Sequence, residues 1–131
     1  MFLLDTDILI YSLKGVPEVV ENLRAHAKDP KALSVITYGE LIYGAQKSEH
    51  VHENLAKVHR IKEIFPVIEL TCLIMDTFGS LKAELNRKGS VVDDFDLIIG
   101  ATALTMGYCI VTNNESHFRK IPEVKYTNWS K

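Results

Sequence analysis

The sequence predicts an α/β domain in which helices cover both faces of a parallel sheet of four to five strands. Short apolar runs alternate along the chain with longer segments that carry helical periodicity, a pattern typical of parallel sheets. The 131 residues are enough for one core without disulfides or structural metal. A single domain over residues 1–131 is therefore expected.

The predicted strands are short apolar runs that end sharply at turn or helix signals. The first run is followed directly by Asp5, and another begins directly after Gly107. The expected strands are Phe2–Leu4, Leu33–Ile36, Val67–Leu70, Tyr108–Val111 and, at an edge of the sheet, Val124–Tyr126.

The predicted helices are recognised by their apolar stripes and by their ends. Gly15 ends the first helix, and Pro17 suits the first turn of the second. The last helix is apolar on nearly every side, so it is expected to be deeply buried. The expected helices are Ile8–Lys14, Pro17–Lys28, Thr37–Ala45, Val51–Phe65, Ile74–Lys88 and Phe95–Met106.

Polar residues follow these strands at one edge of the predicted sheet. Asp5 ends the first strand, Glu40 lies in the first turn after the second, and Asp96 starts the helix that feeds the strand at 108–111. Thr112 and Asn114 follow that strand. Because all these positions belong to the carboxyl edge of a parallel sheet, we expect the five side chains to converge.

Three carboxylates held together repel one another unless a cation neutralises them. Oxygen ligands suit hard cations, so Asp5, Glu40 and Asp96 predict a site for Mg²⁺, with Mn²⁺ as the alternative. Such a site activates water and neutralises charge on a phosphodiester during in-line displacement. The three acids are therefore expected to be both the metal ligands and the catalytic residues.

Two of these acids also have structural interpretations that the sequence leaves open. Asp5 and Asp7 can serve as a helix N-cap and a first-turn acid. Thr37 and Glu40 match the capping box, in which the glutamate reaches back to the amide of the cap residue. A carboxylate at the end of a buried strand is costly without a partner, which favours a functional Asp5.

Three acids crowd the start of the helix at 95–106. Asp93 or Asp94 suits the N-cap, whereas Asp96 lies inside a helix that is expected to be buried. Asp96 shares a face with Gly100 and Ala103, whose small side chains are expected to permit close approach to the sheet. A carboxylate there needs a partner, and a cation is the obvious one.

Further polar residues near the same edge form a secondary group of site candidates. Thr112–Glu115 has turn chemistry, and the hydroxyl of Thr112 or an Asn amide is suited to hold a water or a phosphate oxygen. The secondary candidates are Thr6, Asp7, Asp94, Thr112, Asn114 and Glu115. Four histidines are interpreted as surface residues, namely His50, His52, His59 and His117.

Composition sets weaker bounds on function. The net charge of −2 and the pI of about 6.2 argue mildly against nucleic-acid binding, although an acidic metal site would itself lower the total charge. Cys72 and Cys109 lie in apolar runs without metal-ligand spacing and are predicted to be buried free thiols. The chain shows no signal peptide and no membrane-spanning run, so a cytoplasmic protein is expected.

Four motifs, in this order and spacing, resemble VapC-type toxins of the PIN-domain ribonuclease family over essentially the whole chain. They are Leu4–Asp7, Glu40–Ala45, Asp94–Gly100 and Val111–Asn114, and the segment Ile121–Trp129 resembles the family's tail. The resemblance implies a PIN-like three-layer α/β/α fold and a Mg²⁺-dependent endoribonuclease. It also implies the toxin half of a type II toxin–antitoxin pair, usually dimeric and inhibited by a VapB-like antitoxin.

The resemblance further implies structured RNA substrates, often tRNA anticodon loops, and carries the catalytic acids over to Asp5, Glu40 and Asp96. The chain departs from the family pattern in two places. Asp7 stands where many relatives have asparagine. The fourth acid that many PIN domains place near Asn114 is absent, with Glu115 beside it and a histidine at 117 where some relatives carry an acid. The number of metal ions is therefore open.

Two other classes of function are consistent with parts of the sequence. Leu4–Leu9 resembles the nucleophile motif of haloacid-dehalogenase-like phosphatases, but the acidic cluster Asp93–Asp96 precedes Thr112, which is the wrong order for that mechanism. A non-catalytic partner-binding module would use the acids only as helix caps. The distinguishing observation is whether the carboxylates of Asp5, Glu40 and Asp96 lie within reach of one ion.

Overall fold

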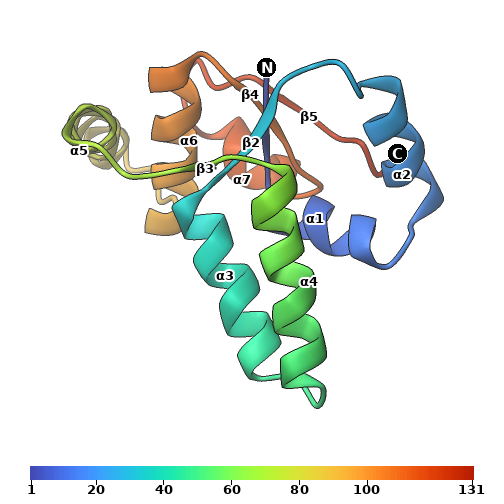
Figure 1. Ribbon diagram of the computed structural model, residues 1–131. Coiled ribbons are helices and arrows are strands. Elements are labelled where there is room, and N and C mark those ends of the chain that lie inside the picture. The colour runs from blue at the N-terminus through green and yellow to red at the C-terminus, as the bar shows by residue number, and fades with distance from the viewer.

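Five short parallel strands form the centre of the molecule. They are β1 (Phe2–Leu4), β2 (Lys31–Ser34), β3 (Val67–Ile68), β4 (Cys109–Val111) and β5 (Tyr126–Thr127). The computed structural model, which describes residues 1–131, places them in the order β3-β2-β1-β4-β5 (Figure 1). In this parallel register, Leu3 of the central strand lies opposite Ala32 on one side and Ile110 on the other.

Seven helices connect and cover these strands. They are α1 (Thr6–Leu13), α2 (Pro17–Ala25), α3 (Val35–Gln46), α4 (Val51–Ile64), α5 (Cys72–Arg87), α6 (Asp94–Met106) and α7 (Glu115–Arg119). α3 and α4 pack side by side and extend past the sheet as a pair (Figure 1). No helix combines the length and the apolar character that crossing a membrane requires.

Alternate residues of the strands feed two separate cores, one on each face of the sheet. Leu3 packs in a core with α5, α6 and α7, whereas Leu4 packs in a core with α1, α2, α3 and α4. The two cores follow from the period of two along a strand, since neighbouring side chains point to opposite faces. The predicted α/β/α layering with a parallel sheet is therefore confirmed.

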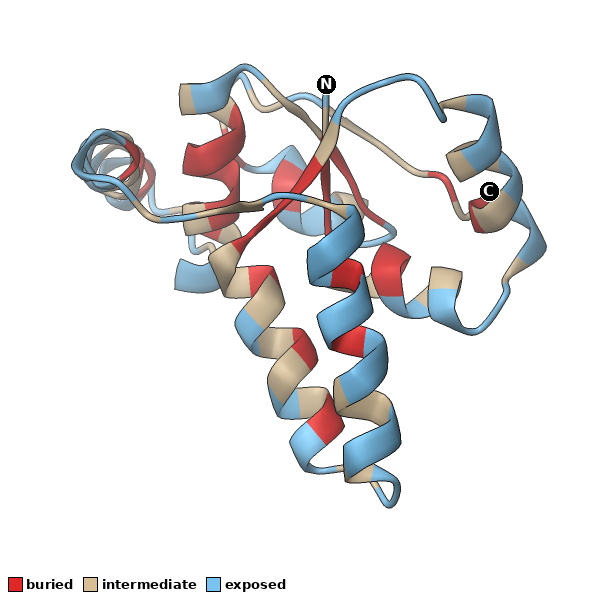
Figure 2. Cartoon of the chain, viewed as in Figure 1, coloured by how far each residue is buried: buried red, intermediate tan, exposed pale blue.

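Buried residues are concentrated in β1, β2, β4 and α6, while α3 and α4 bury only a stripe each (Figure 2). The expectation that α6 is deeply buried is confirmed for the middle of the helix and is wrong at its two ends. Phe95 and Met106, which lie at these ends, are exposed.

The start of α3 differs from the sequence prediction. β2 ends at Ser34, and the Ser34 hydroxyl accepts a hydrogen bond of 3.1 Å from the amide of Ile36, so Ser34 is the N-cap. The capping-box interpretation of Thr37 and Glu40, one of the two that the sequence leaves open, is therefore wrong. Thr37 instead lies inside the helix, fully buried, and its hydroxyl has no hydrogen-bond partner.

Three further expectations are corrected. α2 ends at Ala25 rather than Lys28, because the chain turns toward β2 directly after the His26 C-cap. Cys72 is exposed, since it opens α5 on the side away from the core, and Cys109 is only partly buried. At Gly100 the close approach is not to the sheet, because an added Cβ would lie 2.9 Å from the Cδ1 of Ile121.

Candidate active site

A pocket lined only by polar residues lies at the carboxyl edge of the sheet. Its volume is about 410 Å³, and its lining consists of Asp5, Thr6, Glu40, Asp93, Asp96, Asn114 and His117. We refer to it as the acid pocket, because four of these seven side chains are carboxylates. The structure thus brings the three sequence-predicted acids around one cavity, together with two of the secondary candidates.

Asp5 is the most buried acid of the pocket, with only 6% of its surface exposed. It follows β1 directly and caps α1, and its Oδ1 accepts a hydrogen bond of 2.9 Å from the amide of Thr6. Burial, reinforced by the negative charge of Asp7, raises the pKa of Asp5 to about 7. The Asp5 carboxyl group is therefore only partly ionised at neutral pH, and a nearby positive charge would favour its ionised form.

Thr112, which follows β4, holds the other oxygen of Asp5. Its hydroxyl donates to the Oδ2 of Asp5 at 2.8 Å and accepts from the amide of Asn114 at 2.9 Å. Both side chains of the Thr112–Asp5 pair are buried. The hydroxyl therefore fixes the orientation of the carboxylate and links it to the loop that carries Asn114.

Glu40 lies in the second turn of α3, one turn later than the sequence predicts, because the helix begins at Val35. Its Oε1 accepts a hydrogen bond of 2.7 Å from the hydroxyl of Thr6. Glu40 caps no helix. Its partial exposure and its contact with Thr6 place the carboxylate at the rim of the acid pocket.

Asp96 pairs with a residue that the sequence analysis assigns to the surface. The Nδ1 of His117 lies 2.9 Å from the Oδ2 of Asp96, although 52% of the His117 side chain is exposed. Burial raises the pKa of Asp96, and the nearby His117 opposes that rise. The only sequence signal for His117 was its position where some relatives of the family carry an acid.

Asp7 lies beside the acid pocket rather than in it. Its Oδ1 accepts from the amide of Ile8 at 2.7 Å and its Oδ2 from the amide of Asn113 at 2.9 Å. Burial raises the pKa of Asp7, while these amides lower it. Asp7 therefore ties α1 to the loop after β4, and its charge acts on Asp5 from outside the pocket.

The remaining acidic candidates are divided between the pocket and the surface. Asp93 caps α6 by accepting from the amide of Phe95 at 3.1 Å, and it also lines the pocket, a role that the sequence analysis does not assign to it. Asp94 instead forms an exposed ion pair with Lys82 at 2.9 Å. Glu115 pairs at 2.9 Å with Lys131, so neither Asp94 nor Glu115 contributes to the acid pocket.

The side chains of the acid pocket are of the type that binds a hard cation, but their spacing in this structure does not let three of them bind one ion. No three Asp, Glu, His or Cys side chains anywhere in the chain lie close enough to hold one metal ion together. The carboxylates instead contact the hydroxyls of Thr112 and Thr6 and the ring of His117. The donors are nevertheless carboxylates without thiols, and burial leaves Asp5 in need of positive charge. Joint coordination therefore requires Glu40 and Asp96 to exchange these contacts for the ion.

Comparison with known proteins gives consistent matches over nearly the full length. A family model described as the PIN domain matches residues 2–124. The chain is 33% identical over 129 residues to the tRNA(fMet)-specific endonuclease VapC of Shigella flexneri, and the match covers 98% of each chain.

Two solved structures resemble the fold equally well. One is VapBC2 from Rickettsia felis bound to a DNA fragment from its promoter, with a TM-score of 0.90, 31% identity and 98% of each chain covered. The other is DNA-bound VapBC from Salmonella typhimurium, with a TM-score of 0.90 and 34% identity over 98% of this chain and 97% of that chain.

Proposed function

The chain belongs to the PIN-domain family, among its VapC-type ribonucleases, and we propose that it is a metal-dependent endoribonuclease that cuts structured RNA at the acid pocket. The observation that carries this proposal is Asp5, a buried carboxylate whose pKa is raised to about 7 in an all-polar pocket shared with Glu40 and Asp96. Proteins keep such groups where a bound cation or a reaction uses them.

Asp5, Glu40 and Asp96 are the proposed ligands of Mg²⁺, with Mn²⁺ as the alternative. When bound there, the ion would activate water and neutralise charge on the phosphodiester. The Thr112 hydroxyl orients Asp5, and the Thr6 hydroxyl holds Glu40 at the rim. Glu40, the more accessible of these two carboxylates, is the one we propose to accept the proton of the attacking water.

The proposal includes a tRNA substrate, a VapB-like antitoxin and a cytoplasmic location. The Shigella flexneri relative is named for tRNA(fMet), and the Rickettsia felis and Salmonella typhimurium relatives were solved as VapBC assemblies. These names support the same substrate class and the same kind of partner for this chain, because identity of about one third extends over nearly all residues.

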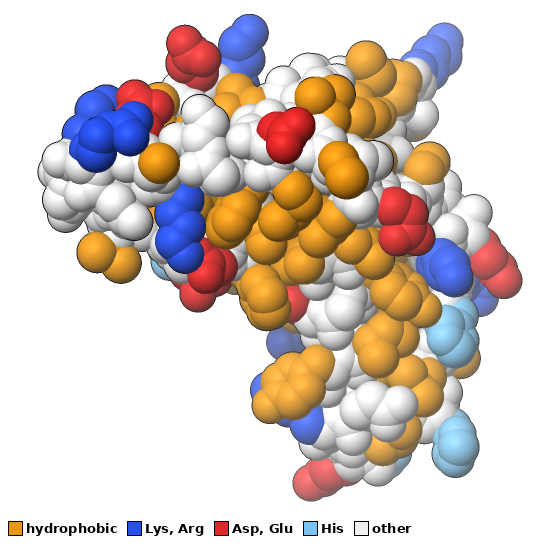
Figure 3. All heavy atoms as spheres, turned by 90° about the vertical axis from the view of Figure 1, so that its left-hand side faces the viewer, with side chains coloured by type: hydrophobic (Ala, Val, Ile, Leu, Met, Phe, Trp, Pro, Cys, Tyr) orange, Lys and Arg blue, Asp and Glu red, His pale blue; other side chains and the backbone are white.

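The proposal also includes a homodimer. Figure 3 shows apolar side chains gathered on the face that carries α3, α5 and α6. Tyr43 and Phe95 belong to this face and are 65% and 52% exposed. Large exposed apolar patches mark protein–protein contacts, so we propose that a second copy of the chain covers this face.

The alternative functions receive less support. A dehalogenase-like phosphatase belongs to a different family from the one that the chain matches over residues 2–124. In a binding module, the acids would serve only as helix caps. Asp5 and Asp93 do cap helices, but Glu40 and Asp96 cap none. The acid pocket therefore contains carboxylates that helix capping does not explain.

Brief induction of the protein in cells, followed by sequencing of RNA 5′ ends, tests the proposal. We expect new ends at defined positions in tRNA, and none with Asp5→Asn, which removes the charge at nearly constant shape. In the variant, the amide oxygen can accept from Thr6 while the amide nitrogen donates to Thr112. Equal cleavage by Asp5→Asn and the unmodified chain in the presence of Mg²⁺ would contradict the proposed metal site.

A further inference from the structure

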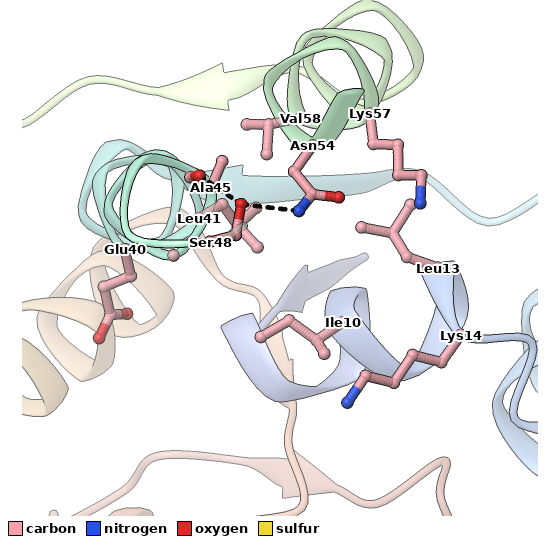
Figure 4. A pocket seen from close by; sticks show the side chains of 11 residues that line it. Ile10, Leu13, Lys14, Glu40, Leu41, Ala45, Ser48, Asn54, Lys57 and Val58 are labelled. Atoms are coloured by element: carbon pink, nitrogen blue, oxygen red, sulfur yellow. Dashed lines mark hydrogen bonds between the residues drawn. The ribbon is translucent and has the colours of Figure 1, made fainter. Parts of the chain in front are cut away.

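A second cavity, of about 460 Å³, lies beside the acid pocket between α1, α3 and α4 (Figure 4). We refer to it as the lysine groove, because Lys14 and Lys57 line it. Glu40 lines both cavities, so the lysine groove adjoins the proposed active site at this residue. A ligand that extends from the acid pocket across Glu40 would reach the lysine groove.

The two lysines of the groove have no acidic partner. Lys14 is the C-cap residue of α1 and Lys57 lies in the middle of α4, and both are exposed. Neither takes part in any of the chain's five ion pairs. Figure 4 shows both side chains at one end of the groove, with Glu40 at the other. The groove thus carries two lysines without an ion-pair partner, next to a cavity lined by four carboxylates.

This placement matters because the acid pocket repels a polyanion. The pocket contains four carboxylates, and the whole chain has a net charge of −2. RNA that reaches such a pocket needs nearby cations to offset the repulsion. Lysine is a common phosphate ligand that acts as a point charge. Exposed Ile10 and Leu13 lie in the same groove and offer apolar contact to ribose or base.

We propose that the lysine groove binds the sugar–phosphate backbone of RNA on one side of the bond to be cut, with Lys14 and Lys57 each contacting one phosphate. This inference rests on the proposed ribonuclease function and adds to it the path of the substrate. The two lysines act by binding RNA, not in the chemical step. Their contribution is expected to depend on salt and not on base sequence.

The test measures the salt dependence of RNA binding in the cleavage-inactive Asp5→Asn protein. Binding of a fluorescent single-stranded RNA of mixed sequence is followed by anisotropy over a KCl series, with and without Lys14→Gln and Lys57→Gln together. Because each phosphate contact on a single strand contributes about 0.7 to the slope of log K against log salt, the slope should fall by about 1.4. The affinity should then be about 25-fold lower at 0.1 M salt and converge toward 1 M.

A matched double variant, Lys28→Gln with Lys125→Gln, provides the control. Both lysines are exposed, and they precede β2 and β5, so they lie toward the opposite edge of the sheet. This control should leave the slope unchanged. Thermal unfolding of each protein, and RNA cleavage by the same lysine variants with Asp5 intact, complete the experiment.

The possible outcomes distinguish a failure of the groove inference from a failure of the proposed ribonuclease function. If RNA is cleaved but the slope is the same in both double variants, the groove inference is wrong and the ribonuclease proposal stands. If the groove variant retains RNA binding and loses binding to a poly-glutamate peptide, the groove is a protein-docking surface and the inference is again overturned. If the unmodified chain neither binds nor cleaves RNA, the proposed function itself fails.

Discussion

The hydroxyl of Thr112 donates a hydrogen bond of 2.8 Å to the Oδ2 of Asp5, and both residues are buried. This contact joins the residue after β4 to the residue after β1, which are neighbouring strands of the sheet. It is the long-range restraint on the orientation of Asp5, because the other carboxylate oxygen accepts from the amide of the next residue in the chain.

Thr112→Val is expected to weaken both the site and the fold. The valine removes the donor to Asp5 and the acceptor of the Asn114 amide, which should cost about 1–3 kcal/mol of unfolding free energy in urea titrations. In the unmodified chain this hydrogen bond lowers the pKa of Asp5. Its loss should raise that pKa, so the acidic limb of the pH–rate profile for cleavage should move to higher pH. Thr112→Ser keeps the hydroxyl and should therefore retain both the stability and the pH–rate profile. An unchanged pH–rate profile in Thr112→Val would contradict the role of Thr112 in orienting Asp5.

The stability of the metal-free protein should fall as the pH rises from about 4 to about 7. The pKa of Asp5 is about 7 in the folded chain, against an ordinary value of 3.8, so the folded state binds more protons than the unfolded state across this window. The loss is of the order of 4 kcal/mol when complete, and Asp5→Asn should remove it. Chemical denaturation in EDTA at several pH values measures the difference between the two proteins.

Mg²⁺ should reverse this loss, since a cation stabilises the ionised form of the site. Its addition should raise the unfolding temperature more at pH 8 than at pH 5, and this difference should vanish in Asp5→Asn. If Mg²⁺ raised the unfolding temperature equally in both proteins at each pH, the ion would bind at a site that does not include Asp5.

His117→Gln is expected to increase the affinity for Mg²⁺. His117 contacts Asp96 at 2.9 Å, and a cation must compete with this contact for the carboxylate. Since an exposed contact of this kind contributes about 0.2–1 kcal/mol, the dissociation constant should fall by up to about fivefold. Isothermal titration with Mg²⁺ measures it, and His59→Gln, which alters an exposed histidine on α4, is the control. A weaker affinity would indicate that His117 helps to hold the ion.

Gly100→Ala is expected to destabilise the fold by about 1–2 kcal/mol, because the new Cβ would lie 2.9 Å from the Cδ1 of Ile121. Ile121 is 3% exposed, so its side chain has little room to move. Ile121→Val removes that Cδ1 atom. Combining the two substitutions should therefore cost less than the sum of their separate effects in a double-mutant cycle, and strict additivity would contradict the contact.

The N-cap of α3 can be tested with two substitutions that are expected to have different effects on the free energy of unfolding. Ser34→Ala removes the hydroxyl that accepts from Ile36 and should cost about 1 kcal/mol. Thr37→Val replaces a buried hydroxyl without a partner by a methyl group, so it should leave the stability unchanged or increase it. Urea denaturation compares the two variants, and a large loss with Thr37→Val would restore the predicted capping box.

The sequence by itself determined the order of strands and helices and the edge at which the acids lie. Apolar periodicity, Gly15 and Pro17 are local signals, and a parallel topology then places Asp5, Glu40 and Asp96 at one edge. Helix ends were less well predicted, because Ser34 and Thr37 are both suitable caps and only the end of β2 decides between them. Helix α7 was not expected, since five residues are too few to show a period.

Tertiary structure alone decided the partners of the site residues. The pairing of His117 with Asp96, and the separation of Asp94 from the pocket by its contact with Lys82, depend on the packing of α7 and α5 against α6. These contacts join residues that are distant in sequence, and their geometry depends on side-chain orientation, which a pattern of residue types does not encode. The raised pKa of Asp5 likewise arises from burial, which exists only once both cores have closed around β1.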